Sequence, residues 1–599
     1  MQSLIIGTIG HIDHGKTSLI EAINGFWGDS RKEEKERGIT LDLSFSNCLS
    51  NNKNISFIDV PGHEKLVKHM IAGAFGMDYC LLVVAVNEGL KPQSVEHIRI
   101  AKLLGISNFI VVFTKCDLEY TDTTNTTREI LELISPLKIF HTSIYDKTSI
   151  ESLKNYLFSL PNKIHRNLDV FRYYIDRVFT LKGIGCVVSG TLLDGKLALE
   201  DRIWCCNLNR ALNIKNIQNH GEYLKVANIG ERVAINLSGV SHNELKRGDL
   251  LTKKGYFRGF DTLDVSIELF SDVAHNSDVI FYIGALKCNA RILFLDDTKR
   301  YATIKTQQKI FAIFKERFII RDDNVTLGGG SILGAIADPM KKSQKLHFLR
   351  LLDTRDFKNA FSLLLQVHKK GFGLLSATQR FAISKEEALK IANTLEDCYV
   401  DSLNLVIYPK SSIEFVLGYI REILHKNKRA LLTSTLLTQK YSWISESLAM
   451  LALQCAISNK LLVKKESFFV SPSFNDSVHS YVYNEIYSML LSYNYEPLAP
   501  YNIYDILDID RKTGDDALKI LTKEKKVLRL SHKLFITSNA LSKLLEEMRV
   551  IIKNEGYLDI NNFKRHFPLS RKYLITYLDY LDSFSDIINI NGIRKLKDS

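Results

Sequence analysis

The stretch that decides the fold of the first domain is Gly10-His11-Ile12-Asp13-His14-Gly15-Lys16-Thr17, which has the spacing G-x-x-x-x-G-K-T. An apolar run at residues 4–9 precedes it, and a helix-like run at residues 18–23 follows it. Strand, spacing and helix together predict a phosphate-binding loop. The two glycines let backbone N–H groups face phosphates, Lys16 supplies positive charge, and the Thr17 hydroxyl can ligate Mg²⁺. We therefore predict that every residue of this stretch belongs to a nucleotide site.

The length and composition of the chain indicate several folded domains. At 599 residues it is too long for one hydrophobic core, and 45% of its residues are hydrophobic. No run of about eighteen apolar residues occurs, and the sequence opens on an apolar strand without a charged leader. The nine cysteines include no C-x-x-C pair, which argues against zinc knuckles and a disulfide framework. We therefore expect a cytoplasmic, monomeric protein that does not bind membranes.

Positive charge is concentrated in the C-terminal part of the chain. Residues 1–340 carry 41 Lys and Arg against 39 Asp and Glu, whereas residues 341–599 carry 38 against 28. Most of the net charge of +12 therefore lies in the second stretch. Such a local surplus favours an anionic partner such as nucleic acid, although a basic surface that only aids solubility is about as common.

A second nucleotide-binding element follows the apolar run at residues 55–58. It has the form D-x-x-G, in which Asp59 can hold the Mg²⁺ shell and the N–H of Gly62 contacts the γ-phosphate. Further apolar runs alternate with a helical pattern, at residues 79–86, 94–104 and 109–113. This alternation predicts a parallel sheet wrapped by helices, with ligands gathered at the strand ends.

Two later strands end in segments that resemble the guanine-specificity elements N-K-x-D and S-A of GTPases. The segments are Thr114-Lys115-Cys116-Asp117 and Thr142-Ser143-Ile144. Asp117 can accept hydrogen bonds from two donors of guanine, a pairing that adenine does not offer, so we predict GTP or GDP as the nucleotide. Thr114 stands where Asn is usual, and its hydroxyl can still bond across to the phosphate loop. Thr114, Lys115, Asp117 and Ser143 therefore complete the predicted nucleotide site.

The resemblance narrows to translational GTPases. It rests on the phosphate loop, Arg37-Gly38-Ile39-Thr40, Asp59-Val60-Pro61-Gly62-His63-Glu64 and Pro92-Gln93-Ser94-Val95-Glu96-His97. The resemblance implies that Thr40 closes over Mg²⁺ when GTP is bound. It also implies that His63 is the catalytic residue, which orients the attacking water once the ribosome positions it. From the residues alone, a lone histidine on such a loop is more often a solvated side chain.

Short alternating strands replace the helical pattern beyond residue 166 and predict an all-β region. Residues 167–256 resemble the second-domain barrel of elongation factors, and residues 257–340 resemble the third domain. With the GTP-binding domain at residues 1–166, the front of the chain looks like a tRNA-carrying elongation factor.

Three residues point to the selenocysteine-specific elongation factors, the SelB family. The strand that carries two acids in ordinary elongation factors here has Asp176-Arg177, and Arg232 lies where those factors have no basic residue. By this resemblance Asp176, Arg177 and Arg232 belong to the aminoacyl pocket. A selenol is anionic at neutral pH, so two arginines could favour it over serine by charge-assisted contacts. The alternative is ordinary surface charge on a barrel.

From residue 341 the chain changes to amphipathic helices separated by short basic β pairs, which is the winged-helix pattern. We expect four units, at residues 341–410, 411–475, 476–539 and 540–599, and bacterial selenocysteine factors end in this way. In the last unit Arg571, Lys572, Arg594 and Lys595 are predicted to contact the phosphates of an mRNA hairpin. Basic residues in the first turn of a helix oppose the helix dipole, so they fit a contact with phosphates better than a role in stabilising the helix. The alternative is that they form an ordinary solvated face.

The sequence thus predicts a multidomain fold: an α/β P-loop GTPase domain, two β-barrel domains and tandem winged-helix domains. We expect a GTPase that uses Mg²⁺, carries selenocysteyl-tRNA and is tethered to a messenger hairpin at the ribosome. The alternatives are the GTPase subunit of a sulfate adenylyltransferase and a general elongation or initiation factor with an unrelated tail. A basic winged-helix tail argues against the first alternative.

Overall fold

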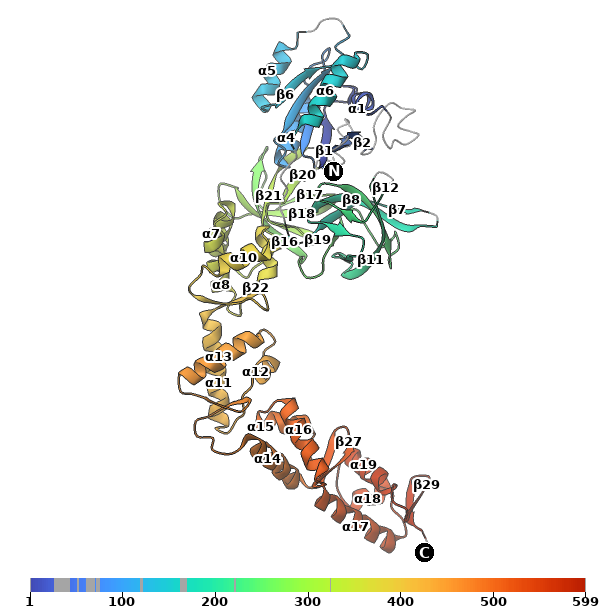
Figure 1. Cartoon of the computed structure of the whole chain (residues 1–599), viewed down its shortest axis with the longest axis vertical. Coiled ribbons are helices and arrows are strands. Elements are labelled where there is room, and N and C mark those ends of the chain that lie inside the picture. The colour runs from blue at the N-terminus through green and yellow to red at the C-terminus, as the bar shows by residue number, and fades with distance from the viewer. Residues whose placement is uncertain are drawn as a thin grey trace. The chain divides into compact units, whose positions relative to one another are not determined.

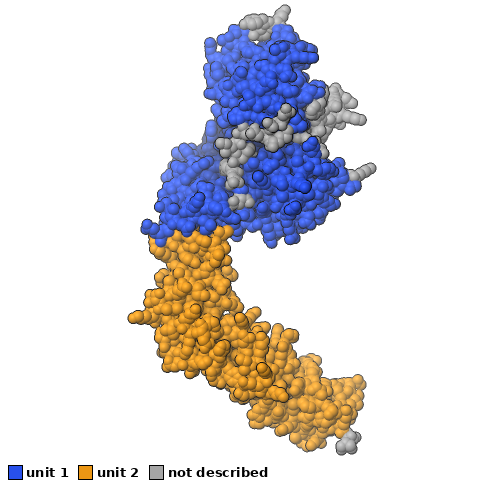
Figure 2. All heavy atoms as spheres, in the orientation of Figure 1, with its two compact units in different colours: residues 1–368, 372–396 blue, residues 369–371, 397–599 orange. Residues whose placement is uncertain are grey.

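The structure is a computed structural model, and it describes residues 2–25, 44–50, 53–60, 71, 76–118, 122–161, 168, 170–181, 183–219, 222–323 and 325–597. The chain divides into two compact units (Figure 2). Unit 1 comprises residues 1–368 and 372–396, and unit 2 comprises residues 369–371 and 397–599. Each unit is described by itself below.

The N-terminal domain is a sheet with helices on both faces. The described strands follow the order β2-β3-β1-β4-β5-β6, in which β2 is antiparallel to β3 and the others are parallel. They are β1 (Gln2–Ile9), β2 (Ser44–Ser50), β3 (Lys53–Asp59), β4 (Tyr79–Ala85), β5 (Phe109–Thr114) and β6 (Lys138–His141). The described helices are α1 (Lys16–Asn24), α4 (Pro92–Leu103), α5 (Thr124–Leu133) and α6 (Lys147–Ser159). The predicted helix-wrapped sheet is confirmed, because α4 and α5 pack in one buried cluster on the sheet and α1 and α6 in another.

Two closed barrels follow in unit 1 (Figure 1). The first has the order β10-β15-β7-β8-β14-β11, and β11 pairs back with β10. Its strands are β7 (Arg172–Leu181), β8 (Gly185–Asp194), β10 (Arg202–Cys205), β11 (Arg210–Asn219), β14 (Arg232–Ser238) and β15 (Leu250–Thr252). Short strands β9 (Leu197–Ala198), β12 (Glu222–Leu224) and β13 (Val226–Ala227) lie at its margin.

The second barrel closes in the order β16-β19-β18-β17-β20-β21. Its strands are β16 (Phe260–Leu269), β17 (Ser277–Ile283), β18 (Leu286–Phe294), β19 (Tyr301–Ile310), β20 (Arg317–Arg321) and β21 (Thr326–Gly334). A Cβ atom on Gly330 would overlap the carbonyl oxygen of Ser266, which explains a glycine where β21 pairs with β16. Both predicted β regions are therefore barrels.

Buried charges join the parts of unit 1. Arg172 on β7 donates from Nε to Asp194 Oδ2 at 2.6 Å and from Nη1 to Glu316 Oε1 at 3.1 Å, which connects the two barrels. Arg321 on β20 donates from Nη1 to Glu96 Oε1 on α4 at 2.9 Å, which connects the second barrel to the GTPase domain. Because buried ions need partners, each of these pairs ties its two domains to one relative position.

Helices and β hairpins alternate after the barrels. Unit 1 contains α7 (Lys342–Asp353), α8 (Phe357–Val367), β22 (Phe372–Gly373), α9 (Ala377–Phe381) and α10 (Lys385–Ala392). Unit 2 opens with the hairpin β23 (Cys398–Asp401) and β24 (Val406–Pro409). The segment predicted as the first winged-helix domain is thus divided between the two units, and the domain boundaries stay predictions.

Unit 2 then repeats three helices and a hairpin three times. The first set is α11 (Lys410–Lys426), α12 (Ser434–Lys440), α13 (Glu446–Ser458), β25 (Val463–Lys465) and β26 (Phe468–Val470). The second is α14 (Val478–Tyr493), α15 (Pro500–Leu507), α16 (Arg511–Lys523), β27 (Val527–Ser531) and β28 (Leu534–Thr537). The third is α17 (Ser538–Glu555), α18 (Ile560–His566), α19 (Arg571–Leu581), β29 (Ile587–Ile590) and β30 (Ile593–Leu596). Each set has the winged-helix pattern, and together with the barrels and the helix-wrapped sheet they confirm the predicted fold class.

Of the helices that the structure describes, none combines the length and the apolar character needed to cross a lipid bilayer.

The junction between the barrels yields a stability prediction. Glu316→Ala removes one of the two carboxylate partners of the buried Arg172 guanidinium and leaves Asp194, so we expect a loss of about 1.5–3 kcal/mol of unfolding free energy. Differential scanning calorimetry of the full chain measures the loss. The control is Asp278→Ala, which breaks an exposed pair with Arg291 (Nε to Oδ1, 3.0 Å) and should cost less than about 1 kcal/mol. Equal effects of the two substitutions would contradict a bridging role for Arg172.

Candidate nucleotide-binding site

The phosphate loop runs from the end of β1 to the first turn of α1. Gly10 has a φ of 139°, and a Cβ atom on it would overlap the carbonyl oxygen of Val83 on β4. Gly15 adopts a left-handed φ of 80° immediately before α1. These two conformations aim the helix N-terminus at the inside of the loop, where free N–H groups bind anions. His11 and Ile12 are half-buried in the loop and Asp13 is exposed.

Lys16 lies inside this loop. Its Nζ donates to the carbonyl oxygens of His11 at 2.7 Å and Gly10 at 3.2 Å. Burial lowers the pKa of the Lys16 ammonium to about 8. Backbone carbonyl oxygens therefore hold the Lys16 ammonium inside the loop that is predicted to bind phosphates.

Two of the side chains predicted to face Mg²⁺, Thr17 and Asp59, meet directly. Asp59 at the end of β3 accepts from the hydroxyl of Thr17 (Oγ1 to Oδ2, 2.6 Å) and from that of Thr8 (Oγ1 to Oδ1, 2.7 Å). Hydroxyl and carboxylate oxygens are hard ligands that suit Mg²⁺. Beside the phosphate loop, Thr17 and Asp59 therefore form a donor set that fits this ion.

The predicted guanine-binding segments lie together at the ends of β5 and β6. Ser143 Oγ donates to Asp117 Oδ1 at 2.6 Å, which orients the exposed carboxylate. Thr114 Oγ1 donates to the carbonyl oxygen of His14 at 2.7 Å. This bond joins β5 to the phosphate loop, as predicted for the threonine in place of asparagine. Lys115 has a left-handed φ of 59° and pairs with Glu88 (Nζ to Oε1, 3.7 Å).

A buried histidine that the sequence analysis did not assign also contacts the loop. His97 on α4 accepts from the N–H of Gly10 through Nδ1 at 3.4 Å. Burial lowers the pKa of His97 to about 3 and that of His14 to about 4. Both rings are therefore neutral at pH 7, and neutral His97 can accept this bond. The histidine in the Pro92–His97 run was the available signal, but only the packing of α4 places it at Gly10.

The predicted aminoacyl residues form one cluster at the boundary of the first barrel and the GTPase domain. Asp176 and Arg232 are ion-paired, and Ser189 Oγ donates to Asp176 Oδ1 at 2.8 Å. The guanidinium carbons of Arg232 and Arg177 lie 3.6 and 5.1 Å from the ring centroid of Phe45 on β2. Phe45 is a member of the cluster that sequence reasoning missed, because no motif connects it to the barrel.

The residues predicted to bind RNA separate into two kinds. Arg571 and Lys572 are exposed in the first turn of α19, and Lys595 is exposed on β30. Arg594 is instead buried, and its Nε and Nη2 donate to the two carboxylate oxygens of Asp582 at 2.9 and 2.8 Å. Since its charge is already paired, this placement is at odds with a direct phosphate contact by Arg594. The ion pair holds the wing against α19.

Three predicted site residues lie outside the described residues: Thr40, Gly62 and His63. Their predicted roles at Mg²⁺, at the γ-phosphate and in catalysis stay predictions.

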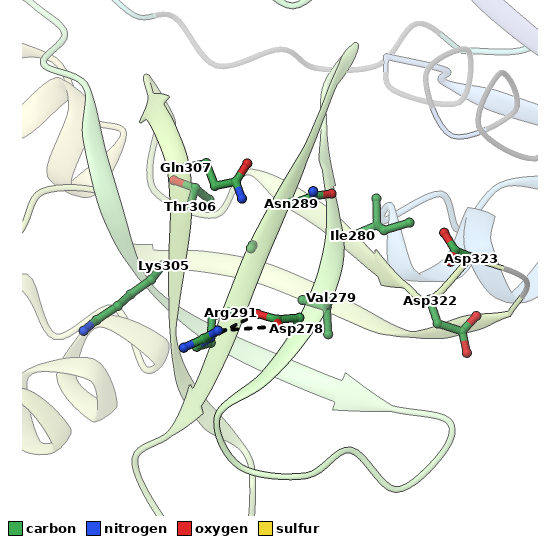
Figure 3. A pocket seen from close by; sticks show the side chains of 11 residues that line it. Asp278, Val279, Ile280, Asn289, Arg291, Lys305, Thr306, Gln307, Asp322 and Asp323 are labelled. Atoms are coloured by element: carbon green, nitrogen blue, oxygen red, sulfur yellow. Dashed lines mark hydrogen bonds and ion pairs between the residues drawn. The ribbon is translucent and has the colours of Figure 1, made fainter.

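A depression of about 620 Å³ lies on the outer face of the second barrel (Figure 3). Asp278 and Arg291 pair across neighbouring strands β17 and β18, with Lys305 on β19 and Asp322 and Asp323 after β20. Its charges are of both signs. It is formed by a different domain from the phosphate loop and is therefore no part of the nucleotide site.

Three family models match the chain. The model for the elongation factor Tu GTP-binding domain matches residues 1–240, and the model for the β-barrel domain of selenocysteine-specific elongation factors matches residues 260–340. The model for the winged helix of elongation factor SelB matches residues 550–596.

Whole proteins give the same assignment. A selenocysteine-specific elongation factor of Desulfomicrobium baculatum is 27% identical over 99% of this chain and 99% of that protein. One from Escherichia coli strain K12 is 30% identical over 61% of this chain and 61% of that protein. The crystal structure of the bacterial selenocysteine-specific elongation factor EF-Sec is 25% identical with a TM-score of 0.66, and the match covers 100% of both chains.

The bond between Thr114 and His14 yields a binding prediction. Thr114→Ala removes one buried hydrogen bond between the base and phosphate elements, so we expect GDP affinity to fall about two- to tenfold. Thr114→Asn retains a donor at this position and should recover most of the affinity. Titration with a fluorescent GDP analogue measures both. A parent-like affinity for Thr114→Ala would mean that the loop is held by other contacts alone.

Proposed function

This chain belongs to the family of selenocysteine-specific elongation factors and is a guanine-nucleotide-binding GTPase, and from this we propose that it delivers selenocysteyl-tRNA to the ribosome at recoded UGA codons. In this proposal the protein acts in the cytoplasm as a monomer. Its C-terminal winged-helix domains bind a hairpin in the messenger. The tether raises the effective concentration of the cargo at one codon.

The observation that carries the proposal is the cluster of Asp176, Arg177 and Arg232. Two guanidinium groups and one carboxylate leave it with a net positive charge, and Phe45 lies against both arginines. An anionic selenolate gains charge-assisted hydrogen bonds at such a site, whereas the neutral hydroxyl of serine gains much weaker ones. Partial burial of the cluster strengthens that difference, because a lower local dielectric strengthens electrostatic contacts.

We assign GTP hydrolysis to the site at the phosphate loop. Thr17 and Asp59, with Thr40, would hold Mg²⁺, which neutralises charge on the phosphates. Gly62 would contact the γ-phosphate, and His63 would orient the attacking water when the ribosome is bound. The distance of 2.6 Å between the Thr17 hydroxyl and the Asp59 carboxylate supports this donor set.

The two alternatives from the sequence are less well supported. A sulfate adenylyltransferase subunit or a general elongation or initiation factor would share the GTPase domain and barrels. The matches of residues 260–340 and 550–596 to models of selenocysteine-specific factors favour the proposed function instead.

The cargo test compares two aminoacyl-tRNAs on arginine variants. Arg177→Ala and Arg232→Ala should reduce discrimination between selenocysteyl-tRNA and seryl-tRNA about ten- to hundredfold, because each removes a charge-assisted contact of about 1.5–3 kcal/mol. Filter binding in the presence of GTP measures both affinities. Asp176→Asn is the matched control, since it adds net positive charge and should leave the preference for selenocysteine. Equal losses for both tRNAs would mean that the arginines hold the tRNA backbone, and a parent chain without any preference would refute the proposed cargo.

The tether test concerns the last winged-helix domain. Arg571→Ala or Lys572→Ala should weaken binding of the messenger hairpin and lower the salt slope of binding by about one counterion or less, because each removes one phosphate contact. Lys553→Ala is the control, because Lys553 is exposed on the neighbouring helix α17. Fluorescence titration at several salt concentrations measures the slopes. If the hairpin and a scrambled stem-loop bind alike at every salt, the tail is a general polyanion surface.

A further inference from the structure

A cavity of about 450 Å³ lies between two winged-helix sets of unit 2. Its walls come from α11 and α12 on one side and from α15 and the start of α16 on the other. Three tyrosines line it, Tyr419, Tyr501 and Tyr504, together with Gln439 and Arg511. The volume and the aromatic walls suit a flat ligand of a few rings.

One wall of the cavity is an exposed stack of an arginine on a tyrosine. The Arg511 guanidinium carbon lies 4.7 Å from the ring centroid of Tyr501, and the Tyr501 side chain is 45% exposed. Tyr504 supports this wall. Its buried ring contacts Tyr501 edge-on, with 6.0 Å between the ring centroids, and its hydroxyl donates to Asp515 Oδ1 at 2.9 Å. Aromatic rings and guanidinium planes are the surfaces on which unstacked RNA bases lie.

The polar groups of the cavity match the edge and backbone of a nucleotide. Gln439 can donate and accept, while Asp505 and Asp508 accept from the amino groups of a base. Lys440 lines the same cavity, and Lys426 is close enough to act electrostatically on Asp508. Among the residues that line the cavity, Lys440 and Arg511 equal the two carboxylates in number, so the stacking surface rather than the net charge favours an RNA base here.

The first turn of α16 repeats the first turn of α19. Both helices begin with Arg-Lys directly after their N-cap residue, as Arg511-Lys512 and Arg571-Lys572. All four side chains are exposed. A positive charge at a helix N-terminus opposes the helix dipole, so helix stability does not account for either pair. Contacts with the negative phosphates of an RNA strand do account for both Arg-Lys pairs.

The two first turns border one short segment. Arg511 lies over Tyr501, and Tyr573 OH in the first turn of α19 donates to the carbonyl oxygen of Pro497 at 2.9 Å. Pro497 and Tyr501 are four positions apart in the chain, so this segment spans at most about 14 Å. Phosphates follow one another at about 3.4 Å in a strand stacked in a duplex and farther apart in an unstacked strand, so at most about four nucleotides cover that distance.

We propose that this cavity is a second RNA-binding site, which takes an unstacked base of an unpaired strand on the stack of Arg511 on Tyr501. Lys440 and Lys512 contact the phosphates on either side of that base. The site is distinct from Arg571, Lys572 and Lys595 of the proposed hairpin tether. It binds single-stranded RNA even where the hairpin assignment fails.

The probe is a fluorescein-labelled RNA dodecamer of alternating cytidine and adenosine, titrated with the full chain. Tyr501→Ala should weaken its binding about tenfold or more, because one stacked base is lost. Tyr501→Phe keeps the ring and should bind within about twofold of the parent. The matched control is Tyr493→Ala, because Tyr493 is also exposed (41%) and lies outside the cavity at the end of α14. A dodecamer of the same charge with abasic sugars should bind the parent about as weakly as the normal dodecamer binds Tyr501→Ala.

Three results overturn the proposal. The first is that Tyr501→Ala binds the dodecamer with the affinity of the parent chain. The second is that Tyr501→Ala weakens binding of the normal and the abasic dodecamer equally, which would mean that the chain recognises only the charge of the strand. The third is that a lysine-rich peptide binds the parent chain and no longer binds the Asp505→Asn variant, while the variant still binds the dodecamer. The cavity would then bind a cationic protein segment.

A stable stem-loop without unpaired ends distinguishes this site from the proposed hairpin tether. Its binding should fall in Arg571→Ala and stay unchanged in Tyr501→Ala, so a failure of the tether does not count against the cavity.

Discussion

The close approach of Gly10 to the carbonyl oxygen of Val83 is the constraint on which the nucleotide site depends. No side chain fits between them, so the chain leaves β1 directly against β4. The loop is then held from other sides, since Thr114 bonds to the carbonyl oxygen of His14 and His97 accepts from the N–H of Gly10. Contacts from β4, β5 and α4 thus fix the backbone that surrounds Lys16. Preorganised N–H groups and a buried ammonium are what phosphate binding requires.

The same helix α4 connects this loop to the second barrel. Glu96 faces outward to Arg321, and the next residue, His97, faces inward to Gly10. Two adjacent residues therefore contact two different domains, because successive side chains on a helix point about 100° apart. On the other side of the GTPase domain, Phe45 on β2 lies against Arg177 and Arg232 of the first barrel. Both barrels thus contact elements next to the nucleotide site.

In unit 2, arginines that appear equivalent in the sequence differ in how far they are buried. Arg571 is exposed, whereas Arg594 forms a bidentate pair with Asp582 and supports the wing. Arg511 lies between these cases, because it is exposed and also stacked on Tyr501. A basic side chain in a winged helix is available to RNA only where no carboxylate has already neutralised it.

The sequence by itself determined the fold class and most of the nucleotide site, because those features depend on local spacing. The G-x-x-x-x-G-K-T loop and the Asp59 and Asp117 segments each follow a strand, and parallel strands bring their carboxyl ends to one edge. Only the tertiary structure decided that His97 and Phe45 join these sites and that Arg594 is buried. It also decided that helices α7 to α10 of the segment at residues 341–410 belong to unit 1, whereas the hairpin of β23 and β24 belongs to unit 2. These outcomes depend on contacts between elements far apart in the chain, and the packing of helices and barrels sets such contacts without leaving a pattern in neighbouring residues.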